Sequence, residues 1–146
     1  MGCPNASFNA VLDSINSYEI ALRPLSWFRQ SEHVDPGNVK FLAETIVRAG
    51  HWLEPIIVEK SCGIVMDGNH RLNAALELGL KRVPCIQLEY GDPRVCVRHW
   101  RTGYHFEVAH IFRTIAQGEI FPYKTTRHEF TPALPVISVP LGELYA

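Results

Sequence analysis

The stretch from Val65 to Gly79, VMDGNHRLNAALELG, constrains the fold most, because a strand, a tight turn and a helix follow one another without a linker. Its first residues continue an apolar, β-branched run. The Asp67-Gly68 pair is typical of a turn. From about His70 to Leu78 the apolar residues recur at helical spacing. A chain built this way is expected to alternate strands and helices.

The segments before this stretch support the same interpretation. Residues 36–50 have Pro36 near the start, apolar residues at helical spacing and Gly50 at the end, which predicts a helix with a glycine cap. The runs Ile56–Val58 and Ile64–Met66 are separated by polar residues that include a glycine, which predicts a hairpin.

The remaining pattern is weaker after about residue 91. Four prolines, at positions 122, 132, 135 and 140, interrupt the last segment, so an extended, irregular strap over the domain is expected there. The other expected elements are a short N-terminal helix over 8–15, strands near 20–22, 82–90 and 94–101, and a helix within 103–118. This mixed order predicts an α+β (mixed α/β) fold, with one domain over residues 1–146 and its core at about 18–92.

Composition narrows the classes of function. Lys and Arg number 14 and Asp and Glu number 15, for a formal charge of −1. The chain therefore lacks the basic excess on which non-specific nucleic-acid binding depends. No apolar run approaches the roughly 20 residues of a membrane helix, and no basic-then-apolar signal opens the chain. We expect a cytoplasmic protein with no membrane partner, for which nucleic acid is an unlikely ligand.

The turn itself has the properties of an anion site. A helix that begins directly after a strand presents unpaired backbone N–H groups, and its macrodipole favours a negative charge. His70 and Arg71 add side-chain donors in the first helical turn. Asp67 would then cap the helix or share a Mg²⁺ ion with the phosphates. The residues alone equally allow an ordinary turn, with Asn69 as the cap and a solvated first turn.

Longer motifs resemble a known family. The stretch from Ile20 to about Tyr90, with the helix ending in Gly50 and then EPIIVEKSCGIVMDGNHRLNAALELG, resembles the ParB/sulfiredoxin superfamily. Three features are similar to the free serine kinases within it: the D-G-x-H-R turn, the loop SEHVDPGNV before the long helix, and the segment FPYKTTRHEF at 121–130, with VRHWR around Trp100.

The resemblance implies a ParB/sulfiredoxin-like nucleotide-binding domain and a kinase that transfers a phosphoryl group from ATP or ADP to L-serine, with Mg²⁺. Glu32 would be the catalytic base, and residues from about 93 to 146 would form the substrate-binding portion. The implied nucleotide phosphate site is Asp67, Gly68, Asn69, His70 and Arg71, with Asp67 also holding Mg²⁺; the implied substrate site is Trp100, Lys124, Thr125, Thr126, Arg127 and His128.

Two departures and several alternatives stay open. Asn69 stands where the family most often has His, and the chain is shorter than the archaeal enzymes of that family. A non-catalytic nucleotide-binding regulator would need neither Glu32 nor the T-T-R-H cluster. A ParB-type DNA-binding protein would need a helix-turn-helix, for which the proline-broken tail leaves no room. A sulfiredoxin would need a cysteine in the turn, and a nuclease would need a further acidic cluster.

Overall fold

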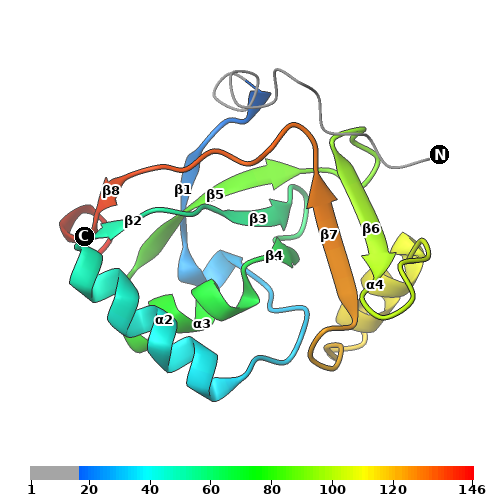
Figure 1. The fold of residues 1–146 in the computed structure, drawn as a ribbon, viewed down its shortest axis with the longest axis horizontal. Helices are drawn as coiled ribbons and strands as arrows, with labels where there is room; N and C mark the ends of the chain where they lie inside the picture. Colours follow the sequence, from blue (N-terminus) through cyan, green and yellow to red (C-terminus); the bar gives the residue numbers. More distant parts are fainter. Residues whose placement is uncertain (1–16) are drawn as a thin grey trace.

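The computed structural model describes residues 17–146, and its chain path is drawn in Figure 1. The helix expected over 8–15 lies outside the described residues. Within 17–146 no helix is both long enough and apolar enough to cross a membrane. Helices and strands are mixed along the chain, as the sequence predicts.

A four-stranded sheet forms the centre of the molecule. Its strand order is β1-β5-β3-β4. β3 and β5 pair in parallel, whereas the β1–β5 and β3–β4 pairs are antiparallel, so the predicted hairpin is the β3–β4 pair. The strands are β1 (Ala21–Pro24), β3 (Ile56–Glu59), β4 (Val65–Asp67) and β5 (Arg82–Leu88).

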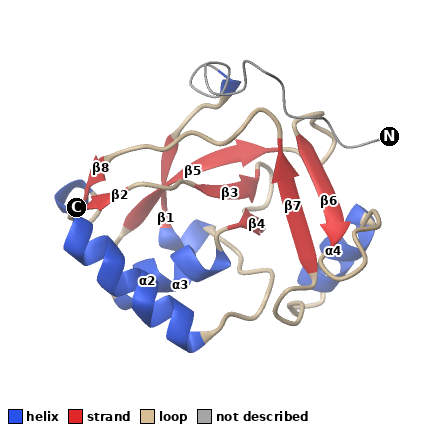
Figure 2. Ribbon diagram, viewed as in Figure 1, coloured by secondary structure: helices blue, strands red, loops and turns tan. Residues whose placement is uncertain are grey.

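Helices α2 (Pro36–Ala49) and α3 (Asn69–Glu77) lie side by side against one face of this sheet (Figure 2). Because side chains alternate along a strand, Ile56 and Val58 pack on this helical side. Gly50 ends α2 in the left-handed conformation, with φ 74°, as its position at the end of the pattern predicts.

The C-terminal elements cover the other face. β6 (Val95–His99) and β7 (Thr126–Phe130) form an antiparallel pair, and α4 (Val108–Ala116) lies next to them at the right of Figure 1. Ile57 of β3 and Ile86 of β5 belong to the same buried cluster as apolar residues of β6 and α4. The helical half and the C-terminal half of the predicted site therefore pack on opposite faces of one sheet, each around its own buried cluster.

The proline-rich tail is extended, but it is more regular than predicted. Thr126–Phe130 form strand β7 instead of irregular chain, because no proline falls between positions 122 and 132 and the backbone can pair fully with β6. The tail then crosses the molecule, pairs as β8 (Val139–Pro140) with β2 (His51–Trp52), and ends after a short 3-10 helix, η2 (Leu141–Glu143). A second 3-10 helix, η1 (Leu25–Trp27), follows β1.

Candidate active site

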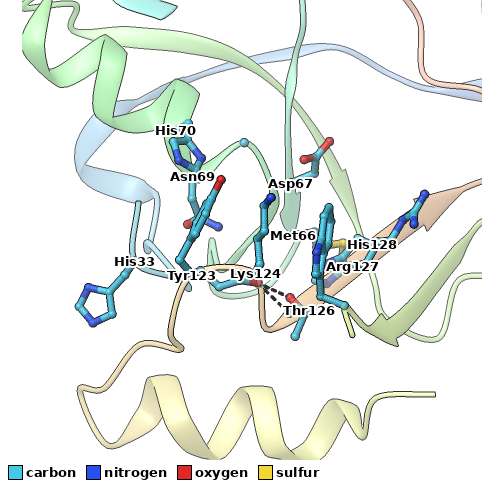
Figure 3. A pocket seen from close by; sticks show the side chains of 13 residues that line it. His33, Met66, Asp67, Asn69, His70, Tyr123, Lys124, Thr126, Arg127 and His128 are labelled. Atoms are coloured by element: carbon cyan, nitrogen blue, oxygen red, sulfur yellow. Dashed lines mark hydrogen bonds between the residues drawn. The ribbon is translucent and has the colours of Figure 1, made fainter. Parts of the chain in front are cut away.

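One cavity of about 330 Å³ brings together most of the predicted site residues. It lies between the β4–α3 turn, the loop that carries Glu32, and the start of β7 (Figure 3). Ten of the twelve predicted residues line it; Arg71 and Thr125 do not. The lining consists of Glu32, His33, Met66, Asp67, Gly68, Asn69, His70, Trp100, Tyr123, Lys124, Thr126, Arg127 and His128.

The turn between β4 and α3 is shaped by Gly68. Its φ of 115° is in a region that side chains disfavour, and a Cβ there would lie 3.2 Å from both the Arg71 guanidinium and Ile56. Gly68 itself is the N-cap, and no side chain caps the helix, so the alternatives in which Asp67 or Asn69 caps α3 are wrong. The first N–H groups of α3 are therefore available to an anion in the cavity.

Arg71 supports this turn from behind and does not line the cavity. Its Nη1 donates hydrogen bonds to the carbonyl oxygens of Pro55, at 2.5 Å, and Glu54, at 3.1 Å. Its Nη2 lies 3.2 Å from the Asp67 carboxylate, and only 13% of the side chain is exposed. The guanidinium is thus bonded to two backbone carbonyl oxygens and paired with Asp67, so the structure does not place it as a direct phosphate ligand.

His70 faces the cavity and also touches the Glu32 loop. Its Nε2 accepts a hydrogen bond from the backbone N–H of Asp35 at 3.0 Å. Burial lowers the pKa of His70, and the neighbouring carboxylates of Asp35 and Glu32 oppose that shift to a smaller extent. A neutral ring with Nε2 as acceptor carries its proton on Nδ1, so one donor remains for a ligand.

Glu32 accepts hydrogen bonds from the first residue of β7 and from the residue before it. Its Oε1 accepts the Thr125 N–H and its Oε2 accepts the Thr126 N–H, both at 3.2 Å. The Thr126 hydroxyl also donates to Oε2. The loop backbone pairs with the same region, since His33 N–H donates to Phe121 O at 2.8 Å. Within residues 17–146 Oε1 therefore accepts fewer bonds than Oε2, which leaves it room for a substrate hydroxyl.

Two cations cluster around Trp100. The Lys124 Nζ lies 5.3 Å from the Trp100 ring centroid and the Arg127 guanidinium carbon lies 5.6 Å from it. Lys124 has a φ of 59°, unusual for a residue with a side chain. Thr125 points elsewhere, because its hydroxyl donates to Pro122 O at 2.6 Å. The cavity wall opposite the turn is therefore cationic and aromatic.

His128 forms the inner part of the same wall. Its Nε2 lies 3.0 Å from the Tyr90 hydroxyl. Desolvation lowers the pKa of His128 to about 3. Burial likewise raises the pKa of Tyr90. Both groups are neutral near pH 7, so His128 can orient a substrate through hydrogen bonds but adds no positive charge.

A metal ion would depend on the ligand for most of its coordination. In the described part of the chain no three His, Cys, Asp or Glu side chains converge as a metal site. Asp67 and Glu32 are the two carboxylates in the lining, and Asp67 is half exposed. One carboxylate fits Mg²⁺, which keeps several waters and binds chiefly to substrate phosphates.

Three lining residues carry no role in the sequence prediction: His33, Met66 and Tyr123. The Tyr123 ring meets His70 edge-on, with ring centroids 5.5 Å apart, and so joins the two sides of the cavity. Tyr123 lies inside the FPYKTTRHEF segment, and that position is the sequence feature from which its place in the site could have been predicted. Figure 3 shows the His33 ring pointing away from the other labelled side chains.

Sequence comparison gives matches over parts of the chain. The ParB N-terminal domain profile matches residues 9–99. An ATP-dependent L-serine kinase from Staphylothermus marinus is 42% identical over 73 residues, which cover 47% of this chain and 29% of that protein. A ParB-like protein from Sulfolobus acidocaldarius is 42% identical over 55 residues, which cover 38% of this chain and 28% of that protein. The matches span less than a third of each relative's length.

Structural comparison extends the likeness over most of the chain. A free serine kinase in complex with AMP has a TM-score of 0.77 at 15% identity, covering 86% of this chain and 93% of that one. A mutant free serine kinase in complex with ADP has a TM-score of 0.78 at 15% identity, covering 86% and 94%. C-terminally truncated SbnI from Staphylococcus aureus has a TM-score of 0.69 at 15% identity, covering 94% and 91%. The predicted mixed α/β fold of the ParB/sulfiredoxin type is confirmed.

Proposed function

This chain belongs to the ParB N-terminal domain family, and we propose that it is a kinase that transfers a phosphoryl group from ATP or ADP to the hydroxyl of L-serine. The single observation that carries this proposal is the shared cavity. A helix N-terminus, a carboxylate and a cationic cluster face one another there. The partial match to an ATP-dependent L-serine kinase supports the choice of donor and acceptor.

The nucleotide phosphates would bind at the β4–α3 turn. The backbone N–H groups that begin α3 and the Nδ1–H of His70 supply donors, and Gly68 lets the chain approach closely. Asp67 would hold Mg²⁺ together with phosphate oxygens, and the ion would neutralise part of the phosphate charge. Arg71 keeps the turn in shape through its bonds to backbone.

Glu32 would accept the proton of the serine hydroxyl. As the hydroxyl oxygen attacks the terminal phosphorus, a new O–P bond forms and the bond from that phosphorus to the nucleotide oxygen breaks. ATP leaves as ADP, or ADP as AMP, and the proton moves to Oε1, the less occupied carboxylate oxygen. The hydrogen bonds from the Thr125 and Thr126 N–H groups fix the direction of that carboxylate.

The serine carboxylate would bind at the cationic wall. Lys124 and Arg127 would supply the charge, and Trp100 lies within cation–π distance of both, where it would form one wall of the substrate site. His128 contributes a neutral hydrogen-bonding group. Thr126 acts through Glu32 instead of binding substrate directly, because its hydroxyl is already donated to that carboxylate.

The test is a product assay with both nucleotides. Purified protein with Mg²⁺ and L-serine is incubated with ATP or with ADP, and O-phospho-L-serine is measured by ³¹P NMR and mass spectrometry. We expect that product with at least one donor. D-serine, L-threonine and L-homoserine serve as acceptor controls. Nucleotide binding without a phosphorylated product from any acceptor would instead indicate a non-catalytic nucleotide-binding regulator.

A further inference from the structure

Asn69 uses both ends of its amide to hold the residue next to Glu32. The Ser31 N–H donates to Asn69 Oδ1 at 2.9 Å, and Asn69 Nδ2 donates back to Ser31 Oγ at 3.1 Å. The Ser31 hydroxyl in turn donates to Val65 O at 2.6 Å. Ser31 is buried, with 5% of its surface exposed, so these bonds are protected from water. These bonds occupy the carbonyl oxygen and one of the two N–H groups of Asn69, so Ser31 fixes the orientation of the amide.

Two more α3 side chains hold the loop on either side of Ser31. His70 Nε2 accepts the Asp35 N–H at 3.0 Å. Asn73 Nδ2 donates to Gln30 Oε1 at 3.1 Å. The first contact lies after Glu32 in the chain and the second lies before it. Figure 3 shows Asn69 and His70 projecting from α3 toward this loop.

We propose that Asn69, His70 and Asn73, which we call the α3 clamp, are positioning residues for Glu32, with Asn69 the central one. This inference rests on the proposed function. Within the described residues the loop around Glu32 pairs with other segments only through isolated bridges, so the side-chain bonds from α3 add to the backbone bonds at Phe121 in holding it. Because the same helix begins at the phosphate turn, the clamp fixes the base relative to the phosphoryl donor.

An amide suits this position for a geometric reason. Its donor and acceptor lie on one planar group and point the same way, which matches the N–H and hydroxyl of one serine. The two ring nitrogens of a histidine diverge, so a neutral imidazole cannot serve both groups of Ser31 at once. Asparagine at position 69 therefore fits the bonds to Ser31 better than histidine would, and the role proposed for it is to position the Glu32 loop and not to bind phosphate.

A positioning role for Asn69 and a phosphate-binding role for Asn69 predict different kinetic effects of the same substitution. Asn69→Ala should lower kcat about tenfold to a hundredfold, because a displacement of the Glu32 carboxylate by about 1 Å from the reacting hydroxyl slows the reaction by a factor of that order. The dissociation constant for ADP should stay within about threefold, since no phosphate contact is lost. Ser31→Ala, which keeps the backbone bond to Asn69, should lower kcat less. A phosphate-binding Asn69 would instead give weaker ADP binding and a raised nucleotide KM.

The experiment combines steady-state kinetics, ADP calorimetry and amide hydrogen exchange by NMR on the full chain. The variants are Asn69→Ala, Ser31→Ala and, as a matched control, Asn38→Ala, whose amide is exposed on α2. We expect the Ser31 amide to exchange about tenfold faster in Asn69→Ala and unchanged in the control. Unchanged exchange, or a loss of ADP affinity as large as the loss of kcat, would overturn the clamp. If the wild type makes no phosphoserine, the proposed kinase fails, and the exchange rates still decide whether Asn69 holds the loop.

Discussion

Replacing Arg71 with alanine should cost stability more than nucleotide affinity. The side chain is 13% exposed, and its guanidinium donates to the carbonyl oxygens of Pro55 and Glu54 beneath the phosphate turn. The D-G-x-H-R motif implies a phosphate ligand at this position, whereas the structure points the group away from the cavity. The two roles predict different results for one variant.

The magnitude follows from the bonds that the variant loses. A hydrogen bond from a charged donor contributes roughly 1.5–3 kcal/mol, and an unsatisfied buried carbonyl costs about 1–3 kcal/mol. Pro55 is fully buried, so its oxygen has no water to replace the guanidinium. The ion pair with Asp67 adds little, because that carboxylate is 49% exposed. We expect Arg71→Ala to lower the free energy of unfolding by about 3 kcal/mol, which corresponds to a Tm roughly 6–12 °C lower.

Urea and thermal denaturation measure the loss, and ADP calorimetry is run at a temperature where the variant is folded. Arg113→Ala is the control, since Arg113 and its partner Glu107 are both largely exposed, and it should change stability by less than about 0.5 kcal/mol. The ADP dissociation constant of Arg71→Ala should rise less than tenfold, or about 1.4 kcal/mol. Near-normal stability with a much larger loss of ADP affinity would refute this reasoning.

Three further predictions concern the cavity. Gly68→Ala should weaken ADP binding at least about tenfold, since a Cβ would lie 3.2 Å from Arg71 and strain a φ of 115°; calorimetry that finds wild-type affinity would contradict this. Lys124→Ala should raise the KM for L-serine with little change in the KM for the nucleotide, and the opposite pattern would move the carboxylate site elsewhere. The pKa of His128 is lowered in the folded protein, so below about pH 6.5 the unfolded chain binds a proton there and the folded chain does not. The contribution of His128 to the free energy of unfolding should therefore fall by up to about 2 kcal/mol at pH 5. Urea denaturation measures this, and a His128→Gln variant whose urea midpoint depends on pH as strongly as that of the wild type would contradict it.

Local sequence signals predicted the elements well. The apolar spacing and Gly50 located α2, and the β-branched runs located the β3–β4 hairpin. The signals are local because hydrophobic period, proline and glycine act within a few residues. The tail was harder to predict. Its prolines marked extended chain correctly, but strand β7 exists because β6 is available to pair with it, and that partner lies far away in sequence.

The candidate site shows the same division. Residue types and motif order identified ten of the residues that line the cavity. The direction of each side chain depended on contacts distant in sequence, so the sequence did not show that Arg71 turns to Pro55 or that Thr125 turns to Pro122. The sequence predicted Asn69 as a helix cap or a phosphate ligand, whereas the structure shows its amide bonded to Ser31, a contact between residues distant in sequence.

The most direct measurement compares O-phospho-L-serine formation by the wild type and by Glu32→Gln, at matched protein and saturating nucleotide. Glutamine keeps the shape of the side chain but cannot take a proton, and a general base contributes about 10²–10⁴-fold to rate. We expect product from the wild type, at least a hundredfold less from Glu32→Gln, and similar ADP affinity in both proteins. Equal product from both proteins would remove Glu32 from the chemistry, and no product from the wild type with either nucleotide would contradict the proposed kinase.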